Sequence, residues 1–377
     1  MHNNPFKFGS TVTGRNFCNR RDEIAELSQD IRNGTNILLY SPRRYGKTSL
    51  LLEVLEHMKA EGYLTYYLDL YPATTKEKFI ALYARSIARE ERGTKEKILA
   101  WLKNVLPKMI PKIILRGEDL DIEFEFDKTQ PLAPLYEDLF NLVNQKAQDA
   151  SKRAVLVLDE FQEIYHYPTD EIEREMRSAI QKHSNVSYIF AGSKRSIMAE
   201  LFENPDRPFY RSVKKFTIGA ISRNELSSFM FERFSATGKN VAADLIDEIL
   251  DLTECQPYYT QQLGYYFWDL INTGAPINEV TVYQSINRIL EVETPAYQNI
   301  WDLLTHRQRN LLAGIAIDSP KSLYGQDFIN RFSLVSSAVV QKSIIRLVRN
   351  DIIHKKNSHF VIEDVFFKKW LQVNFGN

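Results

Sequence analysis

Short apolar runs alternate with amphipathic segments over the first 220 residues. Five runs have the length and apolar content of strands: residues 36–40, 65–69, 153–158, 186–193 and 214–218. Between them, apolar residues recur at helical spacing, as in the sets Leu50, Leu51, Val54, Leu55, Met58 and Phe79, Leu82, Tyr83, Ile87. Strands that alternate with helices predict an α/β fold, in which a parallel sheet has helices on both faces.

The pattern becomes helical after residue 220. Ser222 and Glu225 are spaced as a capping box, and further helices are expected near residues 241–253, 257–273 and 280–289. Helical segments at 305–317, 325–332 and 336–350 then precede a hairpin pattern at 351–362, an order typical of a winged helix. We therefore predict an α/β core at 1–220, a helical subdomain at 221–298 and a winged-helix domain at 299–377.

Residues 91–130 interrupt the alternation of the first domain. Pro107, Pro111 and Gly117 break the helical periodicity, and an acidic run follows at 118–125. We interpret this stretch as a surface insertion. Its carboxylates predict a solvated face rather than a metal site, because their spacing implies no ligand geometry.

The first strand is followed by a loop that can enclose a phosphate group. Residues 41–48 match the pattern G-x-x-x-x-G-K-[ST] at each fixed position except the first, where Ser41 replaces Gly. In such a loop, backbone N–H groups and the positive end of the next helix surround a β-phosphate. A turn that merely caps a helix would not explain the strand before it and the amphipathic helix after it. The residues expected to bind ATP are Ser41, Pro42, Arg43, Arg44, Tyr45, Gly46, Lys47, Thr48 and Ser49.

A later apolar strand, at 153–158, ends in two adjacent carboxylates, Asp159 and Glu160. Ligands of open α/β sheets bind at the carboxyl ends of the strands, so both side chains are expected beside the phosphate loop. We predict that Asp159 and Thr48 hold Mg²⁺ and that Glu160 is the general base for the attacking water. Such a strand end means little by itself, but it is informative downstream of a phosphate loop.

Two further segments carry candidate catalytic residues. Strand 186–193 ends in Ser193, where a side chain can sense the γ-phosphate; the alternative is a turn that caps the next helix. Arg207 and Arg211 lie in a Pro-broken segment and are candidates for a γ-phosphate contact or an arginine finger between subunits. Each is otherwise expected to be a surface ion-pair residue.

The N-terminal segment, residues 6–21, has two interpretations. Its glycines and apolar residues suit a clamp for the adenine ring, or they form an arm tied to the core. The sequence pattern leaves both interpretations open.

The third helix of the winged-helix pattern carries a basic stripe. One face holds Val340, Ile344, Leu347 and Val348, and the opposite face holds Lys342, Arg346 and Arg349. A basic face turned away from the core suits the phosphates and guanines of DNA. A solvated face of a packing or regulatory module is the alternative, because three charges are few.

Charge and composition exclude several classes of protein. The chain has 48 basic and 48 acidic residues, which argues against a general nucleic-acid coat or a polybasic membrane anchor. Residues 301–377 contain 11 Lys and Arg against 6 Asp and Glu, so a different partner is expected for this part. Cys18 and Cys255 have no metal-binding spacing, and no run of about 18 apolar residues occurs. We expect a cytoplasmic protein without a membrane partner.

These stretches together resemble the archaeal-type ATPase family, close to the STAND branch of the AAA+-like P-loop NTPases. The matching residues are 8–17 with Arg20, then 41–50, 155–162, 191–193, 208–211, 304–308 and 364–371. The resemblance implies a P-loop NTPase sheet, a helical lid subdomain, a closing winged helix, bound ATP and Mg²⁺, and it adds Arg20 to the nucleotide-binding residues. Two positions depart from the family: Ser41, and Cys255-Gln-Pro-Tyr258 in place of a Gly before the lid proline.

Three functions follow as hypotheses. The first is a slow ATPase that works as a nucleotide-driven switch between ATP and ADP states. The second is a nucleotide-bound scaffold without turnover, which the presence of Glu160 disfavours. The third is a regulator whose ATP state gates DNA binding by the winged helix. The partner of the winged helix is DNA or a protein, and a nucleotide-dependent homo-oligomer is compatible with the Arg211 hypothesis.

Overall fold

The computed structural model describes residues 3–18, 20–89, 109–116, 119–126, 133–318, 322–356 and 359–376. The chain divides into two compact units. One consists of residues 20–219, and the other combines residues 1–19 with residues 220–377. The second unit is therefore discontinuous in sequence.

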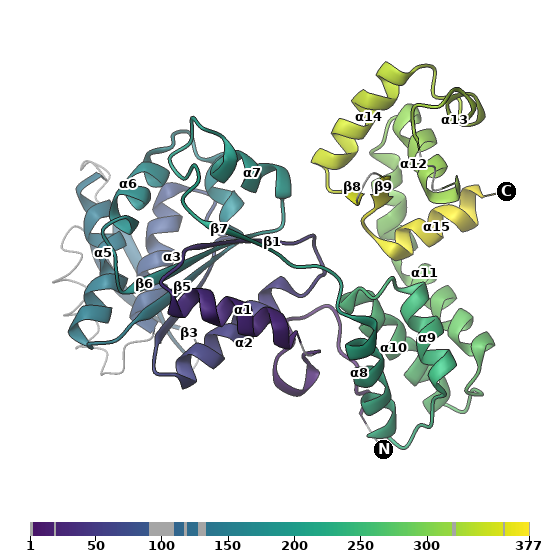
Figure 1. The fold of residues 1–377 in the computed structure, drawn as a ribbon, viewed down its shortest axis with the longest axis horizontal. Helices are drawn as coiled ribbons and strands as arrows, with labels where there is room; N and C mark the ends of the chain where they lie inside the picture. Colours follow the sequence, from purple (N-terminus) through teal and green to yellow (C-terminus); the bar gives the residue numbers. More distant parts are fainter. Residues whose placement is uncertain are drawn as a thin grey trace. The chain divides into compact units, whose positions relative to one another are not determined.

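A five-stranded parallel sheet forms the centre of the first unit (Figure 1). Its strands are β1 (Ile37–Tyr40), β2 (Leu64–Asp69), β5 (Ala154–Asp159), β6 (Val186–Gly192) and β7 (Lys214–Thr217). Their order is β2-β5-β6-β1-β7, so β6 separates the strand before the phosphate loop from the strand that ends in Asp159. Strands β5 and β6 are buried along their whole length, as parallel strands covered on both faces are.

Helices cover both faces of this sheet, which confirms the predicted α/β architecture (Figure 1). One face packs against α1 (Arg21–Arg32) and α2 (Lys47–Ala60). The other face shares a core with α3 (Lys76–Arg89), α5 (Ala133–Asp149), α6 (Glu171–Ile180) and α7 (Arg195–Glu203). This core includes alternate residues of β5, Leu156 and Leu158, as the period of two in a strand requires.

The predicted insertion contains a hairpin that the sequence analysis did not anticipate. Strands β3 (Met109–Arg116) and β4 (Asp119–Phe126) pair in antiparallel fashion. Residues 119–125 of the acidic run lie in β4, where acidic and apolar residues alternate as Asp-Leu-Asp-Ile-Glu-Phe-Glu-Phe, a strand pattern. Glu118 lies outside the described residues. The other residues of the interval 91–130 lie outside the described part of the chain.

In its described residues, the second unit is helical apart from one hairpin and the short 3-10 helix η1 (Gly14–Asn16). The helices are α8 (Arg223–Ser235), α9 (Ala243–Leu252), α10 (Pro257–Asn272), α11 (Glu279–Asp302), α12 (His306–Asp318), α13 (Gln326–Arg331), α14 (Ser337–Arg349) and α15 (Val365–Phe375). The hairpin pairs β8 (Ile353–Lys356) with β9 (His359–Ile362). The order α12, α13, α14, β8, β9 is the predicted order of a winged helix (Figure 1).

Helix α11 continues beyond the predicted helix at 280–289 and contains Pro295. Packing explains the continuation, because Tyr297 is buried against Phe367 of α15, with ring centroids 5.1 Å apart. The Tyr297 hydroxyl also donates to Asp364 Oδ1 at 3.2 Å. The predicted domain boundary at 298/299 therefore falls inside one helix, and the helices on both sides of it share a continuous core.

The N-terminal segment belongs to the helical unit, whereas the predicted boundaries assigned it to the α/β core. Phe6 is buried against Phe234 and lies over Gly264, where an added Cβ would be 2.9 Å from the Phe6 ring. Phe8 contacts the rings of Tyr258 and Tyr265. This packing agrees with an arm tied to a core, and the adenine clamp stays a prediction.

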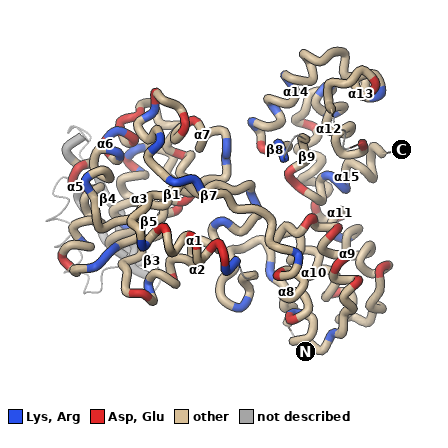
Figure 2. Tube along the Cα trace, viewed as in Figure 1, with Lys and Arg blue, Asp and Glu red and all other residues tan. Residues whose placement is uncertain are grey.

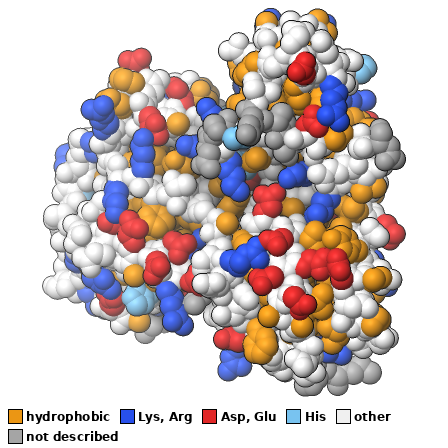
Figure 3. Space-filling view, turned by 45° about the vertical axis from the view of Figure 1, so that its right-hand side comes forward, with side chains coloured by type: hydrophobic (Ala, Val, Ile, Leu, Met, Phe, Trp, Pro, Cys, Tyr) orange, Lys and Arg blue, Asp and Glu red, His pale blue; other side chains and the backbone are white. Residues whose placement is uncertain are grey.

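Helix α14 buries one face and exposes the other, as its pattern indicated. Val340, Ile344 and Leu347 are buried. Lys342, Arg346 and Arg349 are exposed, and basic residues recur along α14 in blue in Figure 2. On the face seen in Figure 3, by contrast, basic and acidic side chains are interspersed, in keeping with the balanced total charge.

Candidate nucleotide site

The strand order brings three predicted segments together at the carboxyl edge of the sheet. The phosphate loop leads from β1 into α2, while β6 and then β5 end beside it. Gly46 has φ +79°, the left-handed conformation that a side chain disfavours. No atom lies within 4 Å of a Cβ built there, so the backbone conformation, and not space, explains this glycine.

Lys47 is the electrostatic centre of the site. Its Nζ donates to Asp159 Oδ1 and, at 2.7 Å, to Glu160 Oε1. Thr48 Oγ1 donates to Asp159 Oδ2 at 2.8 Å. The structure thus assembles the predicted loop lysine, threonine and two carboxylates, although they are more than 100 residues apart in sequence.

Ser193 also reaches this group, in agreement with its predicted position. Its Oγ donates to Glu160 Oε2 at 3.1 Å. A γ-phosphate that binds beside Lys47 would therefore lie near a hydroxyl already fixed on the general-base candidate. The alternative, in which Ser193 only caps the next helix, finds no support at α7, whose cap residue is Lys194 and makes no side-chain cap bond.

Two functional candidates escaped the sequence analysis. The Tyr67 hydroxyl on β2 donates to Asp159 Oδ2 at 2.9 Å, and Gln162 Nε2 donates to Glu160 Oε2. Gln162 is 1% exposed. In the sequence, Tyr67 looks like an ordinary strand residue. Gln162 could have been predicted as a contact of Glu160, because it is a polar residue only two positions further along the chain.

The charges of the site are mutually dependent. Burial alone would raise the pKa of Asp159, but the Lys47 ammonium and the donors Lys47, Thr48 and Tyr67 outweigh it and hold the pKa below its usual range. Burial and the neighbouring Asp159 charge raise the pKa of Tyr67, so its hydroxyl stays a proton donor. Asp159 is therefore an anion at neutral pH with each oxygen occupied by two donors.

The other predicted nucleotide-binding residues take different positions. Ser41, Tyr45 and Ser49 are buried, Pro42 is half-buried, and Arg43 and Arg44 are exposed. Arg20, predicted to bind nucleotide, is 1% exposed, and its Nη2 donates to Tyr45 O at 2.9 Å and Gly219 O at 2.8 Å. Arg20 therefore supports the backbone of the phosphate loop.

The two arginine candidates differ from one another. Arg207 is 3.1 Å from the buried carboxylate of Glu173 and lies over the Tyr165 ring, so it is an anchored ion-pair residue. Burial raises the pKa of Glu173 to about 7 against the opposing charge of Arg207. Arg211 is exposed, has φ +50° and lies over the ring of its neighbour Tyr210. The structure does not bring Arg211 to Lys47 or Glu160 within its own chain through any described contact.

The donor set at the centre suits Mg²⁺. This ion takes oxygen ligands, commonly one or two carboxylates, with substrate phosphates and water completing its shell. Asp159 and Thr48 provide a carboxylate and a hydroxyl in direct contact with each other. No cluster of three or more His, Cys, Asp or Glu residues with metal-binding geometry occurs among the described residues, so a site formed by protein alone is not indicated there.

The five-stranded parallel sheet carries a phosphate loop after β1 and an acidic pair at the end of β5, and β6 lies between these two strands. This arrangement defines a P-loop ATPase domain. A family model described as an ATPase domain predominantly from Archaea matches residues 17–263, and the chain belongs to this family. A model described as a probable winged helix domain matches residues 295–373. The resemblance to the archaeal ATPase family that the sequence motifs indicated is thereby confirmed.

Relatives and solved structures agree with this assignment. An uncharacterized ATP-binding protein of Methanocaldococcus jannaschii is 29% identical over 156 residues, which are 39% of this chain and 40% of that protein. The chain thus spans about two fifths of the length of this curated relative. The fold is similar to a Walker-type ATPase of Pyrococcus abyssi (TM-score 0.71, 17% identity, 98% and 99% of the chains covered). It is also similar to the ORC2 protein of Aeropyrum pernix (TM-score 0.55, 13% identity, 95% of each chain covered).

None of the described helices combines the length and the hydropathy that a bilayer-spanning helix needs.

Proposed function

We propose that the protein binds ATP with Mg²⁺, hydrolyses it to ADP and phosphate, and uses the two nucleotide states as a switch. The observation that carries this proposal is the double contact of Lys47 with Asp159 and Glu160. This ammonium contacts both carboxylates, and it lies where the β- and γ-phosphates of ATP would attract it. Nucleotide binding therefore competes directly with a contact of the general base.

The contacts suggest an order of events. The ATP phosphates take over Lys47, which frees Glu160 Oε1, while Gln162 and Ser193 keep hold of Oε2. Thr48 and Asp159 would hold Mg²⁺, which would supply positive charge at the β- and γ-phosphate oxygens. Glu160 then accepts a proton from the water that attacks the γ-phosphorus, and the bond to the bridging oxygen breaks to release ADP.

Two variants test this function. Lys47→Ala is expected to abolish tight ATP binding, because Lys47 is the buried cation of the loop, whereas Arg43 and Arg44 are exposed. Glu160→Gln is expected to bind ATP but to lose hydrolysis, because an amide cannot accept the proton of water. Binding is measured by calorimetry and turnover by phosphate release, each with and without Mg²⁺. Unchanged ATP affinity in Lys47→Ala would refute the site.

The same measurements separate the switch from a scaffold without turnover. A scaffold predicts that wild type and Glu160→Gln release phosphate equally slowly. A switch predicts in addition that size-exclusion profiles differ between ATP and ADP. The exposed position of Arg211 supports a homo-oligomer in which this residue acts on a neighbouring subunit.

A second candidate function is DNA binding by the winged helix. Lys342, Arg346 and Arg349 are exposed on α14, and no described residue pairs with them. Other basic residues of this domain have partners: Arg309 with Asp302 and Arg331 with Asp318. Retention of duplex DNA by the full chain at low salt tests this function.

A further inference from the structure

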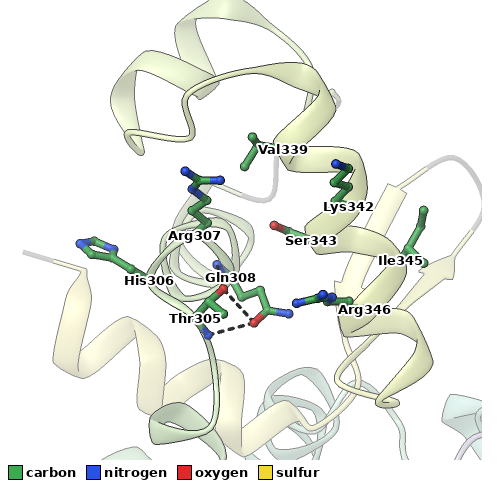
Figure 4. A pocket seen from close by; sticks show the side chains of 9 residues that line it. All are labelled: Thr305, His306, Arg307, Gln308, Val339, Lys342, Ser343, Ile345 and Arg346. Atoms are coloured by element: carbon green, nitrogen blue, oxygen red, sulfur yellow. Dashed lines mark hydrogen bonds between the residues drawn. The ribbon is translucent and has the colours of Figure 1, made fainter.

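A pocket opens between the start of α12 and the exposed side of α14 (Figure 4). Its lining comprises Thr305, His306, Arg307, Gln308, Val339, Lys342, Ser343, Ile345 and Arg346. No acidic residue belongs to this lining, whereas three side chains carry a permanent positive charge. The sequence analysis singled out Lys342 and Arg346 but gave no role to Arg307, which comes from a different helix.

The three cations have no counter-charge in the described part of the chain. Arg307, Lys342 and Arg346 form no ion pair with any described residue, although Arg309, two residues after Arg307, pairs with Asp302. Cations gathered without counter-ions repel each other and attract an anion. The pocket is thus charged in a way that favours a negatively charged ligand.

Two buried polar side chains add neutral donors. Gln308 is 6% exposed, and its Oε1 accepts from Thr305 N and Thr305 Oγ1, both at 2.9 Å. These two contacts fix the amide, so Nε2 is directed toward the cavity, on the side of Arg346 in Figure 4. In the described residues Gln308 Nε2 finds no acceptor.

Ser343 is the second neutral donor. It is 6% exposed, its hydroxyl faces the cavity in Figure 4, and no described group forms a hydrogen bond with it. A serine inside a helix commonly donates to the carbonyl four residues earlier, and this hydroxyl does not. Both donors line the pocket without an acceptor among the described residues, so each is available to an oxygen atom of a ligand.

We propose that this pocket binds a backbone phosphate of duplex DNA. Arg307 and Arg346 present guanidinium donors, Lys342 a point charge, and Gln308 and Ser343 two neutral donors, a set that matches the oxygens of a phosphate. The amino-terminal end of α12 adds a favourable dipole. The proposal rests on the second candidate function above and assigns it a definite phosphate site.

Neighbouring residues favour duplex DNA over the alternatives. Ile345 is 59% exposed between Lys342 and Arg346 on the outer face of α14, where it suits contact with a thymine methyl group. The deep, narrow major groove of an RNA duplex does not admit such a helix. Arg349 continues the basic face of α14 beyond Arg346, which suits a repeating backbone better than a single carboxylate.

The test uses the full chain and a fluorescent 20-base-pair DNA duplex in anisotropy titrations between 50 and 200 mM salt. Lys342→Gln and Arg346→Gln are each expected to weaken binding about tenfold and to lower the salt slope by about one. Ser343→Ala is expected to weaken binding about threefold to tenfold with the salt slope unchanged, because it removes a donor and no charge. The control, Arg288→Gln, loses an equal charge at an exposed position of α11 and is expected to stay within about twofold.

The outcomes separate the site from the function. If the wild-type chain does not retain DNA at 50 mM salt, DNA binding itself fails. If the wild-type chain binds DNA but the charge variants of the pocket behave like Arg288→Gln, the phosphate site fails. It also fails if Ser343→Ala matches wild type, because DNA is then held by diffuse electrostatic attraction alone. The pocket variants are also tested for binding of an oligoglutamate peptide. If they lose this binding but retain DNA as wild type does, the pocket binds an acidic protein segment and the proposal is overturned. ATP binding, measured in parallel, is expected to be unchanged in all of them.

Discussion

Replacement of Lys47 by methionine in the nucleotide-free protein tests the electrostatics of the site without any catalytic assay. The side chains of Lys47 and Asp159 are only 8% and 2% exposed. Methionine keeps most of the length of the side chain and removes its charge. Asp159 then keeps its neutral donors from Thr48 and Tyr67 but loses the only cation that contacts it among the described residues.

The magnitude follows from the burial of the pair. Removal of one partner of a buried ion pair costs about 3–5 kcal/mol of unfolding free energy. The neutral donors that stay on Asp159 place the expected loss near the lower end, about 3 kcal/mol at pH 8. Lys59→Met, an exposed position of the same helix, is the matched control and is expected to change stability by less than about 0.5 kcal/mol.

The sign of the pH dependence provides a second check. In the wild type, the pKa of Asp159 is lowered, so its contribution is present above the unfolded-state pKa and is lost as the pH falls through the folded-state pKa. In Lys47→Met, burial becomes the dominant influence and raises this pKa. Protonation then relieves the buried charge, so the difference between variant and wild type is expected to shrink from pH 8 to pH 5.

Urea unfolding followed by circular dichroism measures both quantities. Three of the four tryptophans, Trp268, Trp301 and Trp370, belong to the helical unit, and the fourth, Trp101, falls within residues 20–219. In a Trp101→Phe background, tryptophan fluorescence therefore provides a transition that the substitution is not expected to move. Lys47→Met with Asp159→Asn is expected to regain most of the lost stability, because the uncompensated charge is gone. A loss equal to that of Lys59→Met, or one that is the same at pH 5 and pH 8, would refute the reasoning.

Three further predictions concern individual side chains. Gln162→Met is expected to lower the hydrolysis rate about 10- to 100-fold with ATP affinity unchanged, because it removes a donor that holds Glu160; an unchanged rate in phosphate-release assays would exclude a positioning role. Gly264→Ala is expected to destabilise the helical unit by about 1–3 kcal/mol, because the new methyl group meets the Phe6 ring; thermal unfolding and faster tryptic cleavage at Lys7 check this. Arg211→Ala is expected to bind ATP normally but to lose hydrolysis by orders of magnitude, with rescue on mixing with a Lys47-deficient chain if Arg211 acts between subunits. Loss without rescue would place it in cis, and full activity would make it a surface residue.

The sheet and the centre of the site were predictable because their signals are local. A phosphate loop has fixed residue spacing, and an apolar strand that ends in Asp159 and Glu160 is recognisable in one short stretch. Tyr67 was not predictable in this way, because its role depends on β2 lying next to β5, with Asp69 opposite Asp159. Aromatic residues in a strand ordinarily indicate core packing.

Long-range packing explains the other differences. The helix predicted at 280–289 ended too early. Pro295 disfavours a helix locally, but Tyr297 and its contacts with α15 favour the continuation of α11. The N-terminal segment was assigned to the nearest domain in sequence, whereas Phe6 packs against Phe234, more than 200 residues away. The family has a glycine before the lid proline, and this chain lacks it. The backbone before Pro257 is nevertheless left-handed, because Glu254 and Cys255 themselves adopt this conformation.

The discontinuity of the helical unit has a mechanical consequence. The polypeptide passes between the two units twice, after residue 19 and after residue 219, so the α/β unit is held by two covalent tethers. Both tethers start from one place, because Arg20 Nη2 donates to Gly219 O at 2.8 Å, and the same nitrogen holds Tyr45 O of the phosphate loop. A double tether resists torsion more than a single strand does. A displacement of Tyr45 in the phosphate loop is therefore coupled, through the Arg20 guanidinium, to both places where the backbone leaves the α/β unit.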